Sequence, residues 1–154
     1  MWMIPYPGGK VRLAQTIVSF LPKVGRTYCE PFVGRGSIFF AAASHLQFKR
    51  WWLNDIATAP FFDAIRNIGD TVEVPPRSKD EYYRQWELAK QGDQRAIILE
   101  PYLTFGGGGY GSGGFGNKKG ATQSGYTKII RECHRLLNNT APKITALDWR
   151  EMGS

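Results

Sequence analysis

The chain has 154 residues, 42% of them hydrophobic, which is enough for one domain with a substantial core. Its 20 basic and 13 acidic side chains give a formal net charge of +7, which suits either an anionic partner such as nucleic acid or a basic but ordinary soluble protein. No apolar run approaches the ~20 residues that span a membrane, and the start of the chain has no signal-peptide pattern. The two cysteines have neither a disulfide spacing nor a zinc spacing. We therefore expect a cytoplasmic protein with no membrane partner and no metal.

The first half of the chain alternates helix patterns with short strand patterns. The expected elements are, in chain order, a helix over 10–21, a strand over 26–30, a helix over 37–46 with Ser37 as its cap, a strand over 49–54 and a helix over 58–68. Pro60 falls in the first turn of the last helix, where proline is tolerated. This alternation predicts a parallel α/β sheet.

The composition changes at residues 72–78, which contain Pro75-Pro76 and predict a linker. The expected elements that follow are helices over 79–90 and 94–105, a glycine-rich loop over 106–125, a helix to Leu137 capped by Ser124, and a strand over 143–147. Ten of the twenty residues in the loop are glycine, which predicts a mobile segment unless something binds it. We therefore divide the chain into an α/β part at 1–72, an inserted segment at 73–125 and a return to the α/β part at 126–154.

The turn after the first strand has the residues of a ligand site. Gly34 and Gly36 allow the backbone to pass close to a ligand, and the following helix amino terminus favours a negative group. A dinucleotide fingerprint would require a third glycine at position 39, where Phe39 stands, so NAD is disfavoured. A tight strand–helix turn without any ligand is the simpler interpretation.

Two further segments are consistent with an adenosine-containing ligand. Asp55 follows the second strand and can accept hydrogen bonds from both ribose hydroxyls, although it can also be a helix cap. Before the first helix, Tyr6 offers an aromatic face and Lys10 a positive charge for a carboxylate. Taken alone, that loop could simply pack the amino terminus.

Together these segments resemble the DNA adenine methylase (Dam-like) family. That family has an aromatic-x-Gly-Gly-Lys segment, then Glu-Pro-Phe-x-Gly-x-Gly-Ser, then Asp-Ile after the second strand; the chain has Tyr6 to Lys10, Glu30 to Ser37, and Asp55-Ile56 in this order. The resemblance implies a truncated, Rossmann-like S-adenosylmethionine-dependent methyltransferase fold with an inserted helical and glycine-rich target-recognition segment. It implies S-adenosylmethionine as cofactor, bound by Tyr6, Gly9, Lys10, Glu30, Pro31, Phe32, Gly34, Gly36, Asp55, Asp148 and Trp149.

The inserted segment and the helix after it are the expected contact with double-stranded DNA. Residues 106–150 contain seven Lys or Arg and two acids, a net charge of +5. Basic side chains suit phosphate contacts and aromatic rings suit stacking on bases. The candidate DNA-binding residues are Tyr110, Phe115, Lys118, Lys119, Lys128 and Arg131, and a disordered spacer is the simpler interpretation of the loop.

The family's catalytic tetrapeptide, Asp/Asn-Pro-Pro-Tyr/Phe, does not occur in residues 1–154. We reject Glu100-Pro101-Tyr102 as a substitute, because it has one proline and lies within a predicted helix. The sequence thus predicts the S-adenosylmethionine-binding portion of an adenine-specific DNA methyltransferase, inactive alone, with a complementary polypeptide that contains the motif as a further partner. The alternatives are a non-enzymatic nucleic-acid-binding protein with a vestigial methyltransferase fold and, less favoured, a dinucleotide-dependent oxidoreductase.

Overall fold

A computed structural model describes residues 4, 9–116 and 121–153 of the chain. The predicted site residues Tyr6, Lys118 and Lys119 lie outside the described residues. No helix within these ranges is both long and apolar enough to cross a membrane.

The sheet has three parallel strands, as the alternation of elements predicted. They are β1 (Val24–Glu30), β2 (Gln47–Asn54) and β3 (Lys143–Thr145), in the spatial order β1-β2-β3. Cys29 of β1 pairs with Trp52 of β2, which pairs in turn with Lys143 of β3. All three carboxyl ends therefore meet at one edge of the sheet, where open α/β sheets bind ligands.

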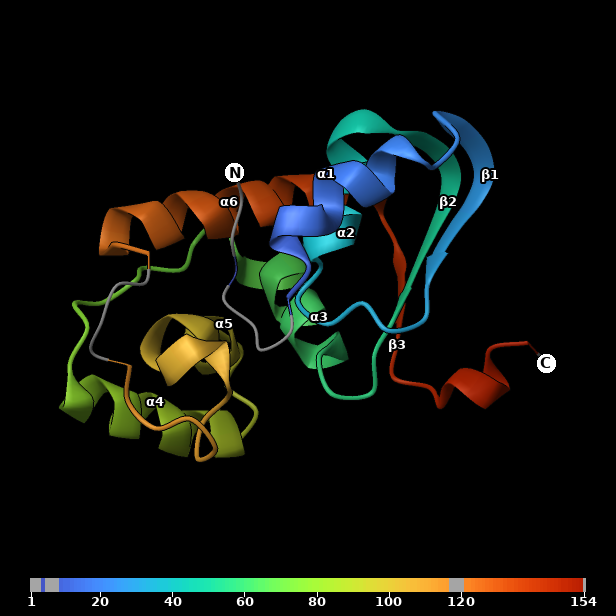
Figure 1. The fold of residues 1–154 in the computed structure, drawn as a ribbon. Coiled ribbons are helices and arrows are strands. Elements are labelled where there is room, and N and C mark those ends of the chain that lie inside the picture. Colours follow the sequence, from blue (N-terminus) through green and yellow to red (C-terminus); the bar gives the residue numbers. More distant parts are fainter. Residues whose placement is uncertain (1–3, 5–8, 117–120, 154) are drawn as a thin grey trace.

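The helices lie to one side of the sheet in the view of Figure 1, with α4 and α5 furthest from it. They are α1 (Val11–Ser19), α2 (Ser37–His45), α3 (Ala59–Ile68), α4 (Lys79–Lys90), α5 (Gln94–Leu103) and α6 (Gln123–Thr140), with short 3₁₀ turns η1 (Phe105–Gly107) and η2 (Trp149–Glu151). Helix α1 packs on α2, α3 packs on α5 and α6, and α4 packs on α5.

Two of the predicted helix caps are wrong. Ser37 is the first residue of α2, and the cap is Gly36, whose φ of 82° is left-handed. A Cβ at Gly36 would lie 2.8 Å from the Phe40 ring, so the turn requires glycine there. Helix α6 is capped by Thr122, whose hydroxyl accepts from the Gly125 N–H at 3.1 Å, rather than by Ser124.

Several predicted element ends also differ from the structure, among them the end of α6 at Thr140 rather than at Leu137. Helix α5 ends at Leu103, because the chain turns into a short antiparallel bridge between Thr104 and Phe115. Strand β3 ends at Thr145 rather than at residue 147, because the Leu147 N–H donates to the Asn54 side chain at 2.9 Å instead of to a strand.

One hydrophobic core joins all three predicted segments of the chain. Fully buried side chains come from residues 1–72 (Phe39, Leu53, Phe61, Phe62), from 73–125 (Ile98, Leu99, Leu103) and from 126–154 (Tyr126, Ile130, Leu137). Each such side chain contributes about 1.5–3 kcal/mol through burial. The Tyr126 hydroxyl donates to the Ile98 carbonyl at 2.7 Å, so α6 and α5 are also tied by a buried hydrogen bond. The segment predicted as an insertion is thus packed into the same core as the sheet.

The described part of the glycine-rich loop makes contacts within the protein, and its mobility stays a prediction. The Phe105 and Gly116 N–H groups donate to Gly114 and Leu103 carbonyls at 3.0 and 2.9 Å. Gly111 donates to the Tyr82 hydroxyl at 3.1 Å, and a Cβ there would lie 2.7 Å from the Trp86 ring. Gly111 therefore lies against an aromatic surface, where a Cβ would require the Trp86 ring to move.

Candidate functional site

Asn54 joins the carboxyl ends of all three strands. Its amide group donates to the carbonyls of Pro31 and Leu147 at 3.0 and 2.9 Å. Its carbonyl oxygen accepts from the Thr145 hydroxyl at 2.7 Å and from the Leu147 N–H at 2.9 Å. The side chain is 1% exposed, and all four hydrogen-bonding positions of the amide are used. This edge of the sheet is consequently fixed where a ligand site is expected.

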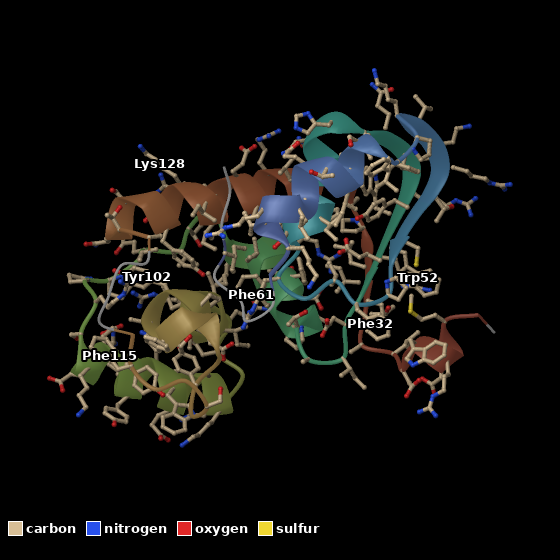
Figure 2. All side chains as sticks on the ribbon, in the orientation of Figure 1. Phe32, Trp52, Phe61, Tyr102, Phe115 and Lys128 are labelled. Carbon is tan, nitrogen blue, oxygen red and sulfur yellow. The ribbon has the colours of Figure 1, made fainter. Side chains whose placement is uncertain are left out.

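A cavity of about 400 Å³ opens at the ends of β1 and β2. This volume is within the range of small-molecule pockets. The cavity is lined by Gly9, Lys10, Glu30, Phe32, Val33, Gly34, Arg35, Ser37, Ile38 and Asp55. Six of these are predicted site residues from three separate segments: Gly9, Lys10, Glu30, Phe32, Gly34 and Asp55. In Figure 2, Phe32 lies at this end of the sheet, close to the lower end of β2.

The Asp55 carboxylate shapes the cavity wall through three backbone N–H groups. Oδ2 accepts from Gly34 at 3.0 Å, which fixes the glycine turn against the end of β2. Oδ1 accepts from Ala57 at 2.9 Å and from Thr58 at 3.1 Å, at the start of α3. A carboxylate has about four lone-pair positions, so this arrangement leaves one for a ligand. Asp55 is therefore both a structural cap and a partner for a single ligand donor.

Glu30 is the second carboxyl group in the cavity wall. Burial raises the pKa of Glu30 to about 7, although hydrogen bonds from the Tyr28 hydroxyl and the Phe39 backbone partly oppose the shift. The Tyr28 hydroxyl donates to Oε2 at 2.7 Å. Burial thus favours the protonated form of the carboxyl group, and a cation bound in the cavity would favour its ionised form.

Arg35 was not predicted as a site residue, yet it lines the cavity with its side chain almost fully buried. Its guanidinium lies over the Phe61 ring, 4.3 Å from the centroid, and forms an ion pair with Glu100 of α5. Glu100 is 65 positions away in the chain, so no local pattern could have identified the pair. The glycine turn is thereby tied to the helices of the second segment.

The other predicted ligand residues that the structure describes, Pro31, Gly36, Asp148 and Trp149, lie outside this cavity's lining. Pro31 presents its carbonyl to Asn54, and Gly36 is packed against Phe40. Asp148 caps η2, accepting from the Arg150 N–H at 3.0 Å and from its guanidinium at 2.8 and 2.7 Å. These contacts hold the pKa of Asp148 below its usual range. Trp149 is 59% exposed.

The predicted DNA-binding residues fall into two groups. Tyr110 and Phe115 pack their rings against Tyr82, with centroids 5.7 and 6.2 Å apart, and the Tyr110 hydroxyl donates to the Ala96 carbonyl at 2.8 Å. Burial raises the pKa of Tyr110. Lys128 and Arg131 are exposed on α6, and Figure 2 shows Lys128 on the outer side of that helix. The Tyr110 and Phe115 rings thus pack within the protein, whereas the Lys128 and Arg131 side chains are exposed to solvent.

Residues that sequence reasoning missed are Arg35, Ser37 and Asn54. An asparagine before Asp55 gives no sign of where its amide points, since that depends on the third strand. Among the described residues, no group of three or more His, Cys, Asp or Glu side chains could hold a metal ion.

The family model described as D12 class N6 adenine-specific DNA methyltransferase matches residues 6–97, more than half of the chain. The matched span includes β1, the glycine turn, β2 and Asp55, and it ends within α5. No curated protein matches the chain.

Proposed function

Because the chain belongs to the family of D12 class N6 adenine-specific DNA methyltransferases, we propose that the cavity at the ends of β1 and β2 binds S-adenosylmethionine. The observation that supports this most is the meeting of Lys10, Glu30 and Asp55 around the glycine turn. The cofactor, when bound, supplies an electrophilic methyl group on a sulfonium cation. The chain then provides the cofactor half of a site that methylates adenine N6 in DNA.

The cavity residues match the groups of this cofactor in chemical type. Asp55 has one free lone-pair position and accepts from one ribose hydroxyl, rather than from both as its sequence position suggested. Lys10 provides a positive charge for the carboxylate, and Glu30 a negative charge for a cationic group. Phe32, 69% exposed at the cavity wall, offers an apolar face to a purine ring.

Calorimetric titration tests this function. We expect S-adenosylmethionine to bind residues 1–154 and NAD not to bind. Because Glu30 has a pKa of about 7 and must ionise to pair with a cation, affinity should rise with pH between about pH 6 and pH 8 and binding should release protons. Each unit by which the bound cation lowers that pKa corresponds to a factor of about ten in affinity.

The Glu30→Gln variant should bind with a flat pH profile over the same range, whereas Glu87→Gln, which changes an exposed carboxylate on α4, should retain the slope. A wild-type affinity that falls with rising pH would refute the role of Glu30. If neither S-adenosylmethionine nor NAD binds, the proposal fails and the non-enzymatic alternative is favoured.

The DNA partner is proposed to contact α6. Lys128, Arg131 and Arg135 are spaced three or four residues apart, so they share one face of the helix, and all three are exposed. Arg135 pairs with Glu132, which leaves Lys128 and Arg131 as the better candidates for phosphate contacts. Lys118 and Lys119, predicted from the sequence, remain candidates as well.

Weak, salt-dependent binding of a DNA duplex follows from this. The logarithm of affinity should fall with log salt by about 0.9 for each phosphate contacted. Replacing Lys128 and Arg131 with Ala should flatten the slope, whereas Lys23→Ala with Lys49→Ala, exposed at the amino end of the sheet, should not. Fluorescence anisotropy at several salt concentrations gives both slopes. An unchanged slope in the α6 double variant would contradict this assignment.

A complementary polypeptide with the catalytic motif is proposed to pair with β1. Among the described strands, β1 has one neighbour, and its free edge is seven residues long, against three for β3. The described order β3-β2-β1 contains no reversal, and in doubly wound sheets the ligand crevice lies where the order reverses, so a parallel strand added beside β1 would create such a reversal at β1. A strand added beside β1 would therefore bring its carboxyl end next to Glu30 and Gly34.

A further inference from the structure

Three charged or polar groups connect the cavity to the glycine-rich segment. Arg35 lies in the cavity wall between Gly34 and Gly36, whose φ angles of 55° and 82° are both left-handed. Its guanidinium forms an ion pair with Oε1 of Glu100 on α5. The other oxygen, Oε2, accepts from the Tyr110 N–H of the glycine-rich segment at 3.4 Å. One carboxylate thus contacts both the glycine turn and the glycine-rich segment.

Burial makes these contacts specific. The side chains of Arg35 and Glu100 are 6% and 24% exposed, and the Phe61 ring lies against the guanidinium. Weak screening by solvent makes the position of each charge depend strongly on the other. On the far side, the Gly111 N–H donates to the Tyr82 hydroxyl, and the Gly111 backbone lies against Trp86. A shift of the Glu100 carboxylate would therefore move the Tyr110 N–H directly and the neighbouring Gly111 through the backbone.

We propose that Arg35 and Glu100 are positioning residues that couple occupancy of the cavity to the placement of residues 109–111. A ligand in the cavity restricts the glycine turn, which restricts Arg35 and through it the Glu100 carboxylate. The inference rests on the proposed cofactor site, because it requires a ligand that fills the cavity. Coupling energies between two such sites change an equilibrium by about 5- to 150-fold.

Amide hydrogen exchange with and without S-adenosylmethionine tests the coupling without any assay of methylation. In the wild-type chain, saturating cofactor should slow exchange of the Tyr110 and Gly111 amides at least about fivefold. The reference is the Gly92 amide, which donates to the Ala89 carbonyl in the turn after α4 rather than to Glu100. Its exchange rate should change by less than about twofold.

The Glu100→Gln variant should still bind S-adenosylmethionine in the calorimeter but lose the differential slowing, and Glu87→Gln should retain it. Slowing that persists in Glu100→Gln, or cofactor binding by the wild type without slowing at Tyr110 and Gly111, would overturn the coupling and leave the proposed function intact. Absence of cofactor binding by the wild type would instead overturn the proposed function, and the coupling with it. If Glu100→Gln does not fold, the exchange rates of the wild type with and without S-adenosylmethionine decide whether the coupling exists.

Discussion

A polypeptide of residues 1–154 should transfer no measurable methyl group to adenine in duplex DNA, even with S-adenosylmethionine bound. Holding the methyl donor near its target can supply about 7–11 kcal/mol through proximity. The adenine amino group, however, is a poor nucleophile because its lone pair is delocalised into the ring. It requires acceptors for its two hydrogens and an aromatic surface for the flipped base, and residues 1–154 have no Asp/Asn-Pro-Pro-Tyr/Phe motif to provide them.

The structure supports rejecting Glu100-Pro101-Tyr102 as a substitute motif. Glu100 is paired with Arg35, and Pro101 lies inside α5. Tyr102 is 4% exposed, stacks on Tyr126 at 5.2 Å and donates its hydroxyl to the Pro75 carbonyl at 3.1 Å. To reach a base, Glu100 would have to leave its ion pair with Arg35, and Tyr102 would have to leave the core.

The measurement is transfer of a labelled methyl group to an adenine-containing duplex, with and without a second polypeptide that contains an Asp-Pro-Pro-Tyr strand. Methyl transfer should appear only when the second polypeptide is present. A supplement with Ala in place of the motif aspartate should remain inactive, which separates catalysis from mere pairing with β1. Robust methylation by residues 1–154 alone would show that another group in the chain performs the motif's role.

The Asp55→Asn substitution should weaken S-adenosylmethionine binding by about 10- to 150-fold, the range for losing a hydrogen bond to a charged group. An amide side chain can still accept from Ala57 and Thr58, but its NH₂ group would face the Gly34 N–H, two donors in opposition. The substitution therefore disturbs both the ligand contact and the glycine turn, while it leaves the start of α3 capped.

Calorimetry on the wild type and the variant measures this loss, and thermal unfolding confirms that the variant is folded. Asp63→Asn is the matched control, because Asp63 is a half-exposed carboxylate on α3 that pairs with Arg66 and does not line the cavity. Equal affinity of wild type and Asp55→Asn would mean that Asp55 is a helix cap only.

The parallel sheet and much of the cavity could be predicted from the sequence because their signals are local. Apolar periodicity and turn residues located β1, β2 and the helix between them to within a few positions. Since the carboxyl ends of parallel strands meet at one edge, Glu30, Gly34 and Asp55 were expected to converge, and they do.

What the sequence did not reveal depends on contacts between distant segments. The Arg35–Glu100 pair joins a turn to a helix 65 positions later, and the pKa of Glu30 depends on burial that only the packed fold creates. The glycine-rich segment was expected to be mobile from composition. The contact of Gly111 with an aromatic surface on α4 could not be foreseen: its N–H donates to the Tyr82 hydroxyl, and a Cβ there would lie 2.7 Å from the Trp86 ring.

The contacts of Asn54 also affect how fast this edge of the sheet is damaged by deamidation. An asparagine deamidates when the backbone nitrogen of the next residue attacks its side-chain carbonyl carbon, and the aspartate formed would have no proton to donate to Pro31 and Leu147. Here the backbone nitrogen of Asp55 donates to the Thr145 carbonyl at 3.1 Å, and the amide is held at four positions. The attack therefore requires β2 and β3 to separate first, so the rate of this damage is limited by local opening of the strand pair.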